Sequence, residues 1–271
     1  MANAEQPPAS KRRSGLPRIP INRMIPNILT LLAVGSGLTA MRFAFQERWE
    51  LAVFAIAVAA IFDALDGRIA RLLKGASKFG AELDSLSDFV SFGVAPAIIL
   101  FLWALQDAGR GAWVLVMLFA MCMGLRLARF NVMSDDEDAP DWKKHFFTGV
   151  PAPAGAGLVL LPMIVAFQAG DDLFRSPWVV QGFLFCVGGL LVSAIPTYSF
   201  KKVAVPRQHF LITMLGAALV IALLASVPWL CLTVILTIYL TSIPLAIRSH
   251  RRFAAGEEVD DPLADDIVDE D

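Results

Sequence analysis

Long apolar segments recur along this chain, and they constrain its fold more than any other feature. A helix needs about 20 mostly apolar residues to cross the hydrocarbon core of a membrane. Segments of this kind occupy approximately residues 26–45, 51–72, 85–105, 112–131, 150–169, 178–198, 210–226 and 229–247. Because 56% of all residues are hydrophobic, a soluble domain is excluded. The expected fold is an all-α, polytopic membrane helix bundle with about eight transmembrane helices.

The last two apolar segments are the least certain as separate spans, since only Ser226, Val227 and Pro228 divide them. Proline interrupts a helix, and the Trp229 that follows is typical of a membrane interface. We therefore expect two helices joined by a tight turn at this position.

Basic residues are distributed unevenly between the two sides of the predicted bundle. Cytoplasmic connections of a membrane protein carry the excess of Lys and Arg. Of the 23 basic residues, only Arg42, Arg48, Arg110 and Arg175 fall on the opposite side. We therefore expect a multi-pass protein of the cell inner membrane with both termini in the cytoplasm.

The two ends of the chain differ in composition from the apolar region. Residues 1–17 contain basic residues but no cleavable signal pattern, and residues 249–271 are acidic with few aromatic side chains. These ends are predicted to be a disordered cytoplasmic arm and an acidic disordered tail, flanking a membrane domain at residues 18–248. The sequence lacks P-loop and dinucleotide-binding motifs, and no nucleic-acid partner is expected.

Four aspartates lie in one stretch, from Asp63 to Asp88, of a chain that otherwise has apolar spans. Each ionisable residue near the centre of a membrane helix costs about 2.5–3.5 kcal/mol on insertion scales, so something must compensate. Asp63 and Asp66 share one helix face with Gly67 and Ala70, at i, i+3, i+4 and i+7. On that face, two carboxylates offer oxygen ligands, and two small residues leave room for another helix or a ligand to approach.

A second helix face repeats this arrangement with Gly80, Asp84, Ser87, Asp88 and Ser91. Two such helices facing each other would form an all-oxygen cage. Carboxylates hold hard divalent ions, chiefly Mg²⁺, whose shells are completed by water and substrate phosphates. The alternative is that these Asp residues are helix caps or solvated loop charges, but two pairs on helical faces favour a metal site with a phosphate-bearing substrate.

Two further pairs of polar residues lie near the same predicted membrane face. Asn27 and Thr30, at i and i+3, could donate hydrogen bonds into a shared polar cleft, or Asn27 could simply lie near a helix cap. Arg126 and Arg129, also at i and i+3, could extend to lipid headgroups or bind an anionic group of a substrate. Both interpretations of each pair remain open from the residues alone.

The spacing of the acidic stretch resembles a known signature. The chain matches every fixed position of D-x₂-D-G-x₂-A-R-x₈-G-x₃-D-x₃-D, with Asp63, Asp66, Gly67, Ala70, Arg71, Gly80, Asp84 and Asp88. This is the signature of the CDP-alcohol phosphotransferase family. The segments LDSLSDFVSFGVAPA, RLARFN and FTGVPAPAGAG resemble its bacterial phosphatidylserine synthase branch. The resemblance covers residues 26–165 well and the last three spans only loosely.

The resemblance implies a reaction in which CDP-diacylglycerol and L-serine give phosphatidylserine and CMP by direct displacement. It implies Mg²⁺ or Mn²⁺ as cofactor and a homodimer in the lipid bilayer. Asp63, Asp66 and Asp84 resemble metal ligands, and Asp88 combines metal binding with the role of general base. The positions that resemble the binding site for CDP-diacylglycerol are Asp66, Gly67, Ala70 and Arg71. Asn27 and Thr30 are added candidates for the same substrate. Arg126 or Arg129 is a candidate to bind the carboxylate of serine.

Two alternative functions accompany this hypothesis. A transferase for glycerol phosphate or inositol phosphate should carry more basic residues around its acceptor site. A divalent-cation transporter could use the same carboxylates as an ion site. The position of Arg71 beside the cluster opposes cation passage, because its positive charge repels the ion.

Overall fold

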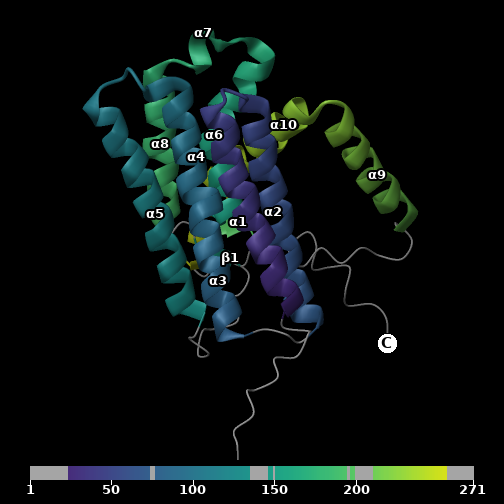
Figure 1. Cartoon of the computed structure of the whole chain (residues 1–271). Helices are drawn as coiled ribbons and strands as arrows, with labels where there is room; N and C mark the ends of the chain where they lie inside the picture. The colour runs from purple at the N-terminus through teal and green to yellow at the C-terminus, as the bar shows by residue number, and fades with distance from the viewer. Residues whose placement is uncertain are drawn as a thin grey trace, which may run out of the picture.

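The computed structural model describes residues 24–73, 77–134, 146–148, 150–193, 196–198 and 210–254. Within these ranges the chain is helical except for one short two-stranded ribbon (Figure 1). The all-α class predicted from the sequence is therefore confirmed. The predicted N-terminal arm lies outside the described residues, as does the acidic tail beyond residue 254.

The first two helices form an antiparallel pair, α1 (Met24–Phe45) and α2 (Trp49–Leu72). Helix α1 turns a row of small residues, spaced three or four apart, toward the rest of the protein. The buried members of this row include Thr30, Ala33 and Gly37. Small side chains let helix backbones approach closely, so α1 can pack tightly on its neighbours.

The third span is one continuous helix made of four segments: α3 (Lys78–Asp88), the π-helical η2 (Phe89–Val94), α4 (Ala95–Leu100) and the π-helical η3 (Phe101–Leu105). It begins earlier than the predicted residue 85, because the Ser77 side chain caps it by accepting a hydrogen bond from the Gly80 N–H at 3.0 Å. This extension places residues 78–84, among them the motif residues Gly80 and Asp84, on a helix.

Helix α6 (Ala152–Ala169) lies in the middle of the bundle. Eleven of its residues are buried. Against it pack α2, the third span and α8 (Pro177–Val192), and α5 (Arg110–Ser134) packs in turn on α8 and on the third span. The short α7 (Asp171–Phe174) follows α6 at one end of the bundle (Figure 1). The interior of the bundle is therefore built around α6.

The sixth predicted span, 178–198, was too long. Helix α8 ends at Val192, and residues Pro196–Tyr198 form strand β2, which pairs antiparallel with β1 (Phe146–Thr148). Pro196 explains the error, because proline cannot continue a helix and disfavours helical backbone at the residue before it. The ribbon joins two segments that are distant in sequence, after α5 and after α8.

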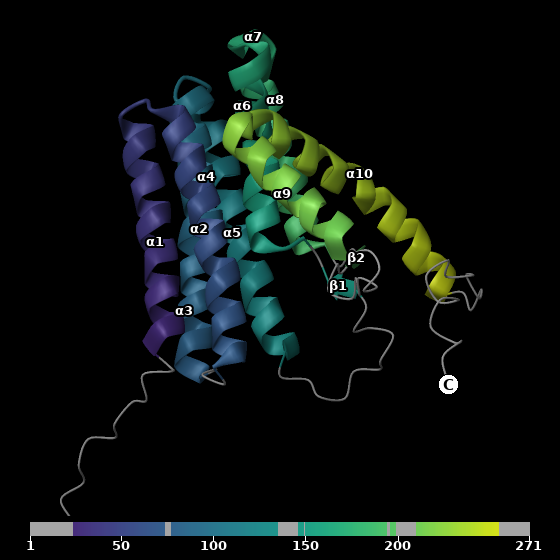
Figure 2. The ribbon, with the colours of Figure 1, turned by 90° about the vertical axis from the view of Figure 1, so that its right-hand side faces the viewer.

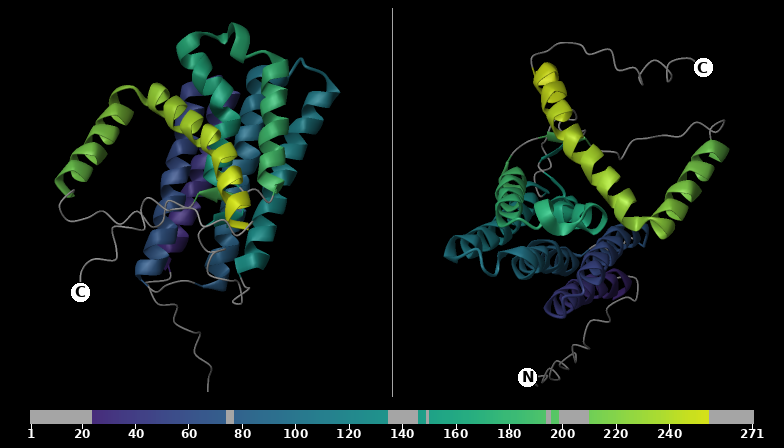
Figure 3. Two further views of the ribbon diagram at one scale, coloured as in Figure 1. Left: turned by 180° about the vertical axis from the view of Figure 1, so that it is seen from behind. Right: turned by 90° about the horizontal axis from the view of Figure 1, so that it is seen from above.

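The last two apolar segments are separate helices, α9 (Phe210–Ser226) and α10 (Pro228–Ala254), with a sharp turn at Val227 between them. Helix α10 crosses the bundle diagonally and packs against α6 (Figure 3). From the turn, α9 diverges from α10 and extends away from the bundle (Figure 3), and Figure 2 shows the two helices from another side. Residues 249–254, at the start of the predicted tail, continue α10.

In the described part of the chain, four helices are long and apolar enough to cross a membrane: Met24–Phe45, Lys78–Leu105, Arg110–Val132 and Ala152–Ala169. Three shorter helices, Pro177–Val192, Thr213–Ser226 and Pro228–Ile243, are also apolar. These helices confirm an integral membrane protein. The total of about eight spans and the cytoplasmic position of both termini stay predictions.

Candidate active site

The acidic residues of α2 and α3 converge at the end of the bundle where α1 and α3 begin and α2 ends (Figure 1). Carboxylate oxygens of Asp63, Asp66 and Asp84 all lie within 4.8 Å of one another. Asp88, one turn after Asp84 on α3, interacts directly with Asp63. The two helix faces recognised in the sequence therefore face each other.

These carboxylates form a donor set that fits a divalent cation. Asp66 is only 4% exposed. Asp84 and Asp88 each bury one carboxylate oxygen that has no hydrogen-bond partner among the described residues. A buried carboxylate oxygen without a partner is strongly destabilising, and a hard cation with a preference for oxygen ligands would satisfy it. The cluster is therefore suited to a divalent metal ion.

Thr30 of α1 orients one of these carboxylates. Its hydroxyl donates a hydrogen bond to Asp66 Oδ2 at 2.7 Å and also lies 3.1 Å from the carbonyl oxygen of Pro26. Because Thr30 is 3% exposed, water does not compete well for this contact. One oxygen of Asp66 is thus held in place, and the other remains available to a ligand.

Two serines attach the third span to α1. The Ser87 hydroxyl donates to the carbonyl of Thr30 at 3.2 Å, and the Ser91 hydroxyl donates to the carbonyl of Ala33 at 3.1 Å. Gly37 permits this approach, because a Cβ at that position would lie 2.8 Å from the Ser91 Cα. Sequence analysis noted both serines on the acidic face but did not predict these bonds, which depend on the placement of α1.

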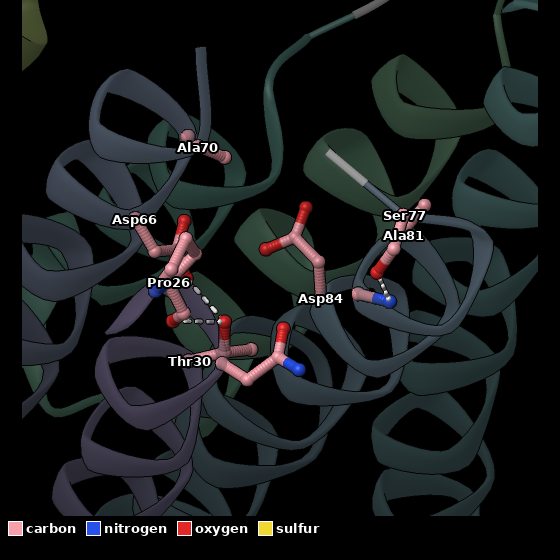
Figure 4. Close-up of a pocket in the computed structure, with 10 residues that line it drawn as sticks. Pro26, Thr30, Asp66, Ala70, Ser77, Ala81 and Asp84 are labelled. Atoms are coloured by element: carbon pink, nitrogen blue, oxygen red, sulfur yellow. Dashed lines mark hydrogen bonds between the residues drawn. The ribbon is translucent and has the colours of Figure 1, made fainter. Parts of the chain in front are cut away.

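A pocket opens beside the carboxylates, between the first three spans (Figure 4). It is lined by Pro26, Asn27, Thr30, Asp66, Gly67, Ala70, Ser77, Gly80, Ala81 and Asp84. Most residues nominated for CDP-diacylglycerol therefore share one pocket. Ser77 and Ala81 were missed, although both lie within one turn of the motif residue Gly80.

Two glycines shape this pocket in different ways. A Cβ at Gly80 would lie 3.0 Å from the Asn27 side-chain oxygen, so Gly80 allows α1 and α3 to approach each other. A Cβ at Gly67 would meet no atom within 4 Å. Gly67 therefore borders open space, which a substrate could occupy.

Arg71 lies outside the pocket lining. Its side chain is exposed, and its Nε donates to the carbonyl of Gly67 at 3.1 Å, one turn earlier on α2. The residue is thus at the rim of the pocket, next to the lining residue Ala70.

The two arginines at the end of α5 have different surroundings. The Nε of Arg126 donates to the carbonyl of Val150 at 2.5 Å, and its guanidinium interacts electrostatically with Asp88 and Asp63. Arg129 is exposed and donates to the carbonyl of Val192 at 3.2 Å, at the end of α8. Of this pair, Arg126 faces the carboxylates.

A third connection, between α3 and α5, was not anticipated. Ser85 and Asn131 are hydrogen-bonded to each other, with Asn131 Nδ2 donating to the Ser85 hydroxyl at 2.9 Å. Both residues lie in segments that the sequence analysis quoted, LDSLSD and RLARFN, but their contact spans 46 residues. The bond fixes α3 beside the helix that carries Arg126.

A model of the CDP-alcohol phosphatidyltransferase family matches residues 23–195. The chain belongs to this family. The match includes the four carboxylates, the pocket and both arginines, and it ends before α9 and α10. Family membership makes the chain a phosphatidyltransferase, and it removes support from the cation-transporter alternative.

Curated relatives cover most of the chain. A protein of Mycobacterium tuberculosis strain H37Rv is 39% identical over 237 residues, which cover 88% of this chain and 82% of the relative. One from Helicobacter pylori strain J99 is 33% identical over 204 residues, covering 74% and 84%. One from Methanocaldococcus jannaschii is 38% identical over 136 residues, covering 50% and 58%. Each is named CDP-diacylglycerol–serine O-phosphatidyltransferase.

Proposed function

We propose that the protein is a phosphatidylserine synthase, which transfers the phosphatidyl group of CDP-diacylglycerol to the hydroxyl of L-serine and releases CMP. The observation that carries this proposal is the pocket lined by Asp66 and Asp84, which belong to one carboxylate cluster with Asp63 and Asp88. Such a site suits a substrate that brings phosphate groups to a bound cation. The choice of L-serine as the acceptor follows from the names of the relatives.

In this proposal, Asp63, Asp66 and Asp84 hold Mg²⁺ or Mn²⁺, with Asp88 alongside. The bound ion would offset the charge of the pyrophosphate and of the departing CMP. Thr30 keeps one oxygen of Asp66 hydrogen-bonded, so that the carboxylate does not have to reorient when substrate arrives.

The nucleotide end of CDP-diacylglycerol would occupy the pocket. Gly67 and Ala70 leave room along α2, and Asn27 offers a polar side chain from α1. Arg71 is placed at the rim, where it could pair with a phosphate. The diacylglycerol would remain in the lipid.

The chemical step would be a direct displacement. Asp88 accepts the proton of the serine hydroxyl, whose oxygen then forms a bond to the phosphorus attached to diacylglycerol. The bond from that phosphorus to the CMP oxygen breaks, and CMP leaves with the electron pair. Arg126 is the better candidate for the serine carboxylate, because it faces Asp88 and Asp63, whereas Arg129 faces the end of α8.

We also propose that the site opens to the cytoplasm and that the protein is a homodimer of the cell inner membrane. The distribution of Lys and Arg supports the first point, because soluble serine and CMP could then exchange on the basic side. The dimer rests on the resemblance to the family.

The proposal is tested with the purified full-length protein, CDP-diacylglycerol, Mg²⁺ or Mn²⁺, and labelled L-serine. We expect CMP release and labelled phosphatidylserine in equal amounts. Preferential use of glycerol 3-phosphate or inositol phosphate in parallel reactions would overturn the choice of acceptor.

A further inference from the structure

Asp84 and Asp88 of α3 are oriented less directly than Asp66 of α2. Asp66 accepts a hydrogen bond from Thr30 at 2.7 Å, whereas Asp84 and Asp88 each bury one oxygen that has no hydrogen-bond partner among the described residues. The directions of these two oxygens therefore depend on how α3 itself is placed. A rotation of α3 about its axis would turn both carboxylates away from Asp63 and Asp66.

Hydrogen bonds attach α3 to its neighbours on both sides of its acidic face. Ser87 donates to a backbone carbonyl of α1 at 3.2 Å, and Ser85 accepts a hydrogen bond from Asn131 of α5 at 2.9 Å. Successive residues of an α-helix are about 100° apart around its axis, so Ser85 and Ser87 are about 160° apart, with Asp84 and Asp88 on the arc between them. A helix held at both edges of this face cannot rotate about its axis without losing one of the two bonds.

The hydrogen bond from α5 continues into the backbone of α3. The Ser85 hydroxyl lies 3.1 Å from the carbonyl oxygen of Ala81, to which it can donate while it accepts from Asn131. Hydrogen bonds linked in this way polarise and strengthen one another. The side chains of Ser85 and Asn131 are both half-buried, and hydrogen bonds between helices stabilise helix packing in a membrane. Asn131 is thus connected to the turn of α3 that carries Asp84.

The end of α5 is itself attached to other parts of the bundle. The Nε of Arg126 donates to the carbonyl of Val150 at the entry to α6, and Arg129 donates to the carbonyl of Val192 at the end of α8. Asn131 follows on the same helix, in the segment RLARFN. Three polar side chains of this segment therefore bond to three different parts of the bundle. Because α6 and α8 hold the end of α5, Asn131 has a fixed position from which to hold α3.

We propose that Ser85 and Asn131 are positioning residues of the metal site, because their hydrogen bond sets the rotation of α3 and so directs Asp84 and Asp88 toward the aspartates of α2. This inference rests on the metal site of the proposed function and deepens it. It assigns to the end of α5 a part in ion binding, although neither Ser85 nor Asn131 touches the ion.

The chemistry of the ion explains why the rotation of α3 matters. Mg²⁺ demands near-ideal octahedral geometry, so a small displacement of a ligand weakens its binding. Residues that orient metal ligands typically contribute about 10–100-fold in metal affinity. Ser85 and Asn131 act through the helix rather than on a carboxylate directly, so we expect about tenfold, the lower end of this range.

The test measures Mn²⁺ binding to the purified full-length protein without substrates, so that the result does not depend on turnover. Free Mn²⁺ is measured by electron paramagnetic resonance during a titration. In Ser85→Ala and in Asn131→Leu, the Kd for Mn²⁺ should rise by about tenfold. Ser36→Ala is the matched control, because the Ser36 hydroxyl donates to the Leu32 carbonyl of its own helix at 2.9 Å, and its Kd should not change.

Two further variants separate positioning from a general loss of stability. The combined Ser85→Ala and Asn131→Leu variant should bind Mn²⁺ about as weakly as either single variant, because both changes remove the same bond. Ser85→Thr keeps the hydroxyl, so its Kd should match that of the unaltered protein. A loss of stability alone would lower the melting temperature without changing the Kd of the folded protein, so the melting temperature of each variant is also measured.

Different failures have different meanings. If the unaltered protein binds Mn²⁺ but makes no phosphatidylserine, the proposed function is wrong, and the titrations still decide the role of Ser85 and Asn131. If the unaltered protein binds no Mn²⁺, the metal site and this inference are both wrong. An unchanged Kd in Ser85→Ala and Asn131→Leu would overturn the inference alone, and so would additive effects in the combined variant.

Discussion

Asp88 has the position that a proton acceptor requires. One of its oxygens is buried without a hydrogen-bond partner among the described residues, and it lies next to both Asp63 and Arg126. Carboxylate oxygens of Asp63, Asp66 and Asp84 lie within 4.8 Å of one another without it. In the proposed function, Asp88 would therefore accept the proton while the other three aspartates hold the ion.

Changing Asp88→Asn keeps the size of the side chain but removes its ability to accept a proton. Turnover should fall by about 10²–10⁴-fold, the usual contribution of a general base. Binding of CDP-diacylglycerol should be largely retained. CMP release and lipid binding measure the two effects, with the exposed Glu82→Gln on the same helix as a control. Unchanged turnover would exclude Asp88 as the base.

Thr30 permits a test of the metal site that leaves every carboxylate in place. The change Thr30→Val removes the 2.7 Å hydrogen bond to Asp66 with little change in shape. Partners that orient a ligand typically contribute 10–100-fold in metal affinity, so the Mg²⁺ or Mn²⁺ concentration for half-maximal activity should rise by about that factor. The exposed Thr39, whose hydroxyl contacts only its own helix, gives the matched Thr39→Val control. Identical metal dependence in both variants would contradict the assigned role.

Contacts between helices set the geometry of these residues. The hydroxyls of Ser87 and Ser91 bond to backbone carbonyls of α1, and Gly37 lies directly against Ser91. Thr30 lies two turns before Gly37 on α1. A displacement of α1 at Gly37 should therefore also misplace Thr30 relative to Asp66.

Gly37→Ala tests this coupling. The added methyl would lie 2.8 Å from the Ser91 Cα, a backbone atom that cannot rotate away. Overpacking of this kind costs about 1–3 kcal/mol, so we expect a lower melting temperature together with reduced activity. Gly35→Ala is the matched control, because a Cβ there meets no atom within 4 Å. Equal melting temperatures of the two variants would show that α1 has room to move.

The sequence predicted well those features that depend on local periodicity. The apolar segments indicated where the helices lie, and the spacing of the aspartates showed that they occupy two helix faces. Both predictions need only the local sequence, because the spacing of residues along a helix determines which of them share a face. Contacts between distant segments were not predictable in this way. The bond between Ser85 and Asn131, the β1–β2 ribbon and the packing of α10 on α6 all depend on how distant segments come together.

The orientation of the whole molecule in the membrane is a prediction that labelling can test. Lys78 and Asp107 lie near opposite ends of the 28-residue helix Lys78–Leu105. At 1.5 Å per residue that helix is about 40 Å long, which exceeds the roughly 30 Å hydrocarbon core. Its two ends should therefore lie on different sides of the bilayer.

Single cysteines at these positions, Lys78→Cys or Asp107→Cys, would be introduced after replacement of Cys122, Cys186 and Cys231. Both side chains are exposed, so a thiol reagent can reach them. A membrane-impermeant reagent should label position 107 in intact cells and position 78 only in inverted vesicles. The pocket opens at the same end of the bundle as Lys78, so this result would place the pocket on the cytoplasmic side. Soluble serine could then enter from the cytoplasm, and CMP could leave to it. Labelling of position 78 from outside would instead reverse the topology derived from the basic residues.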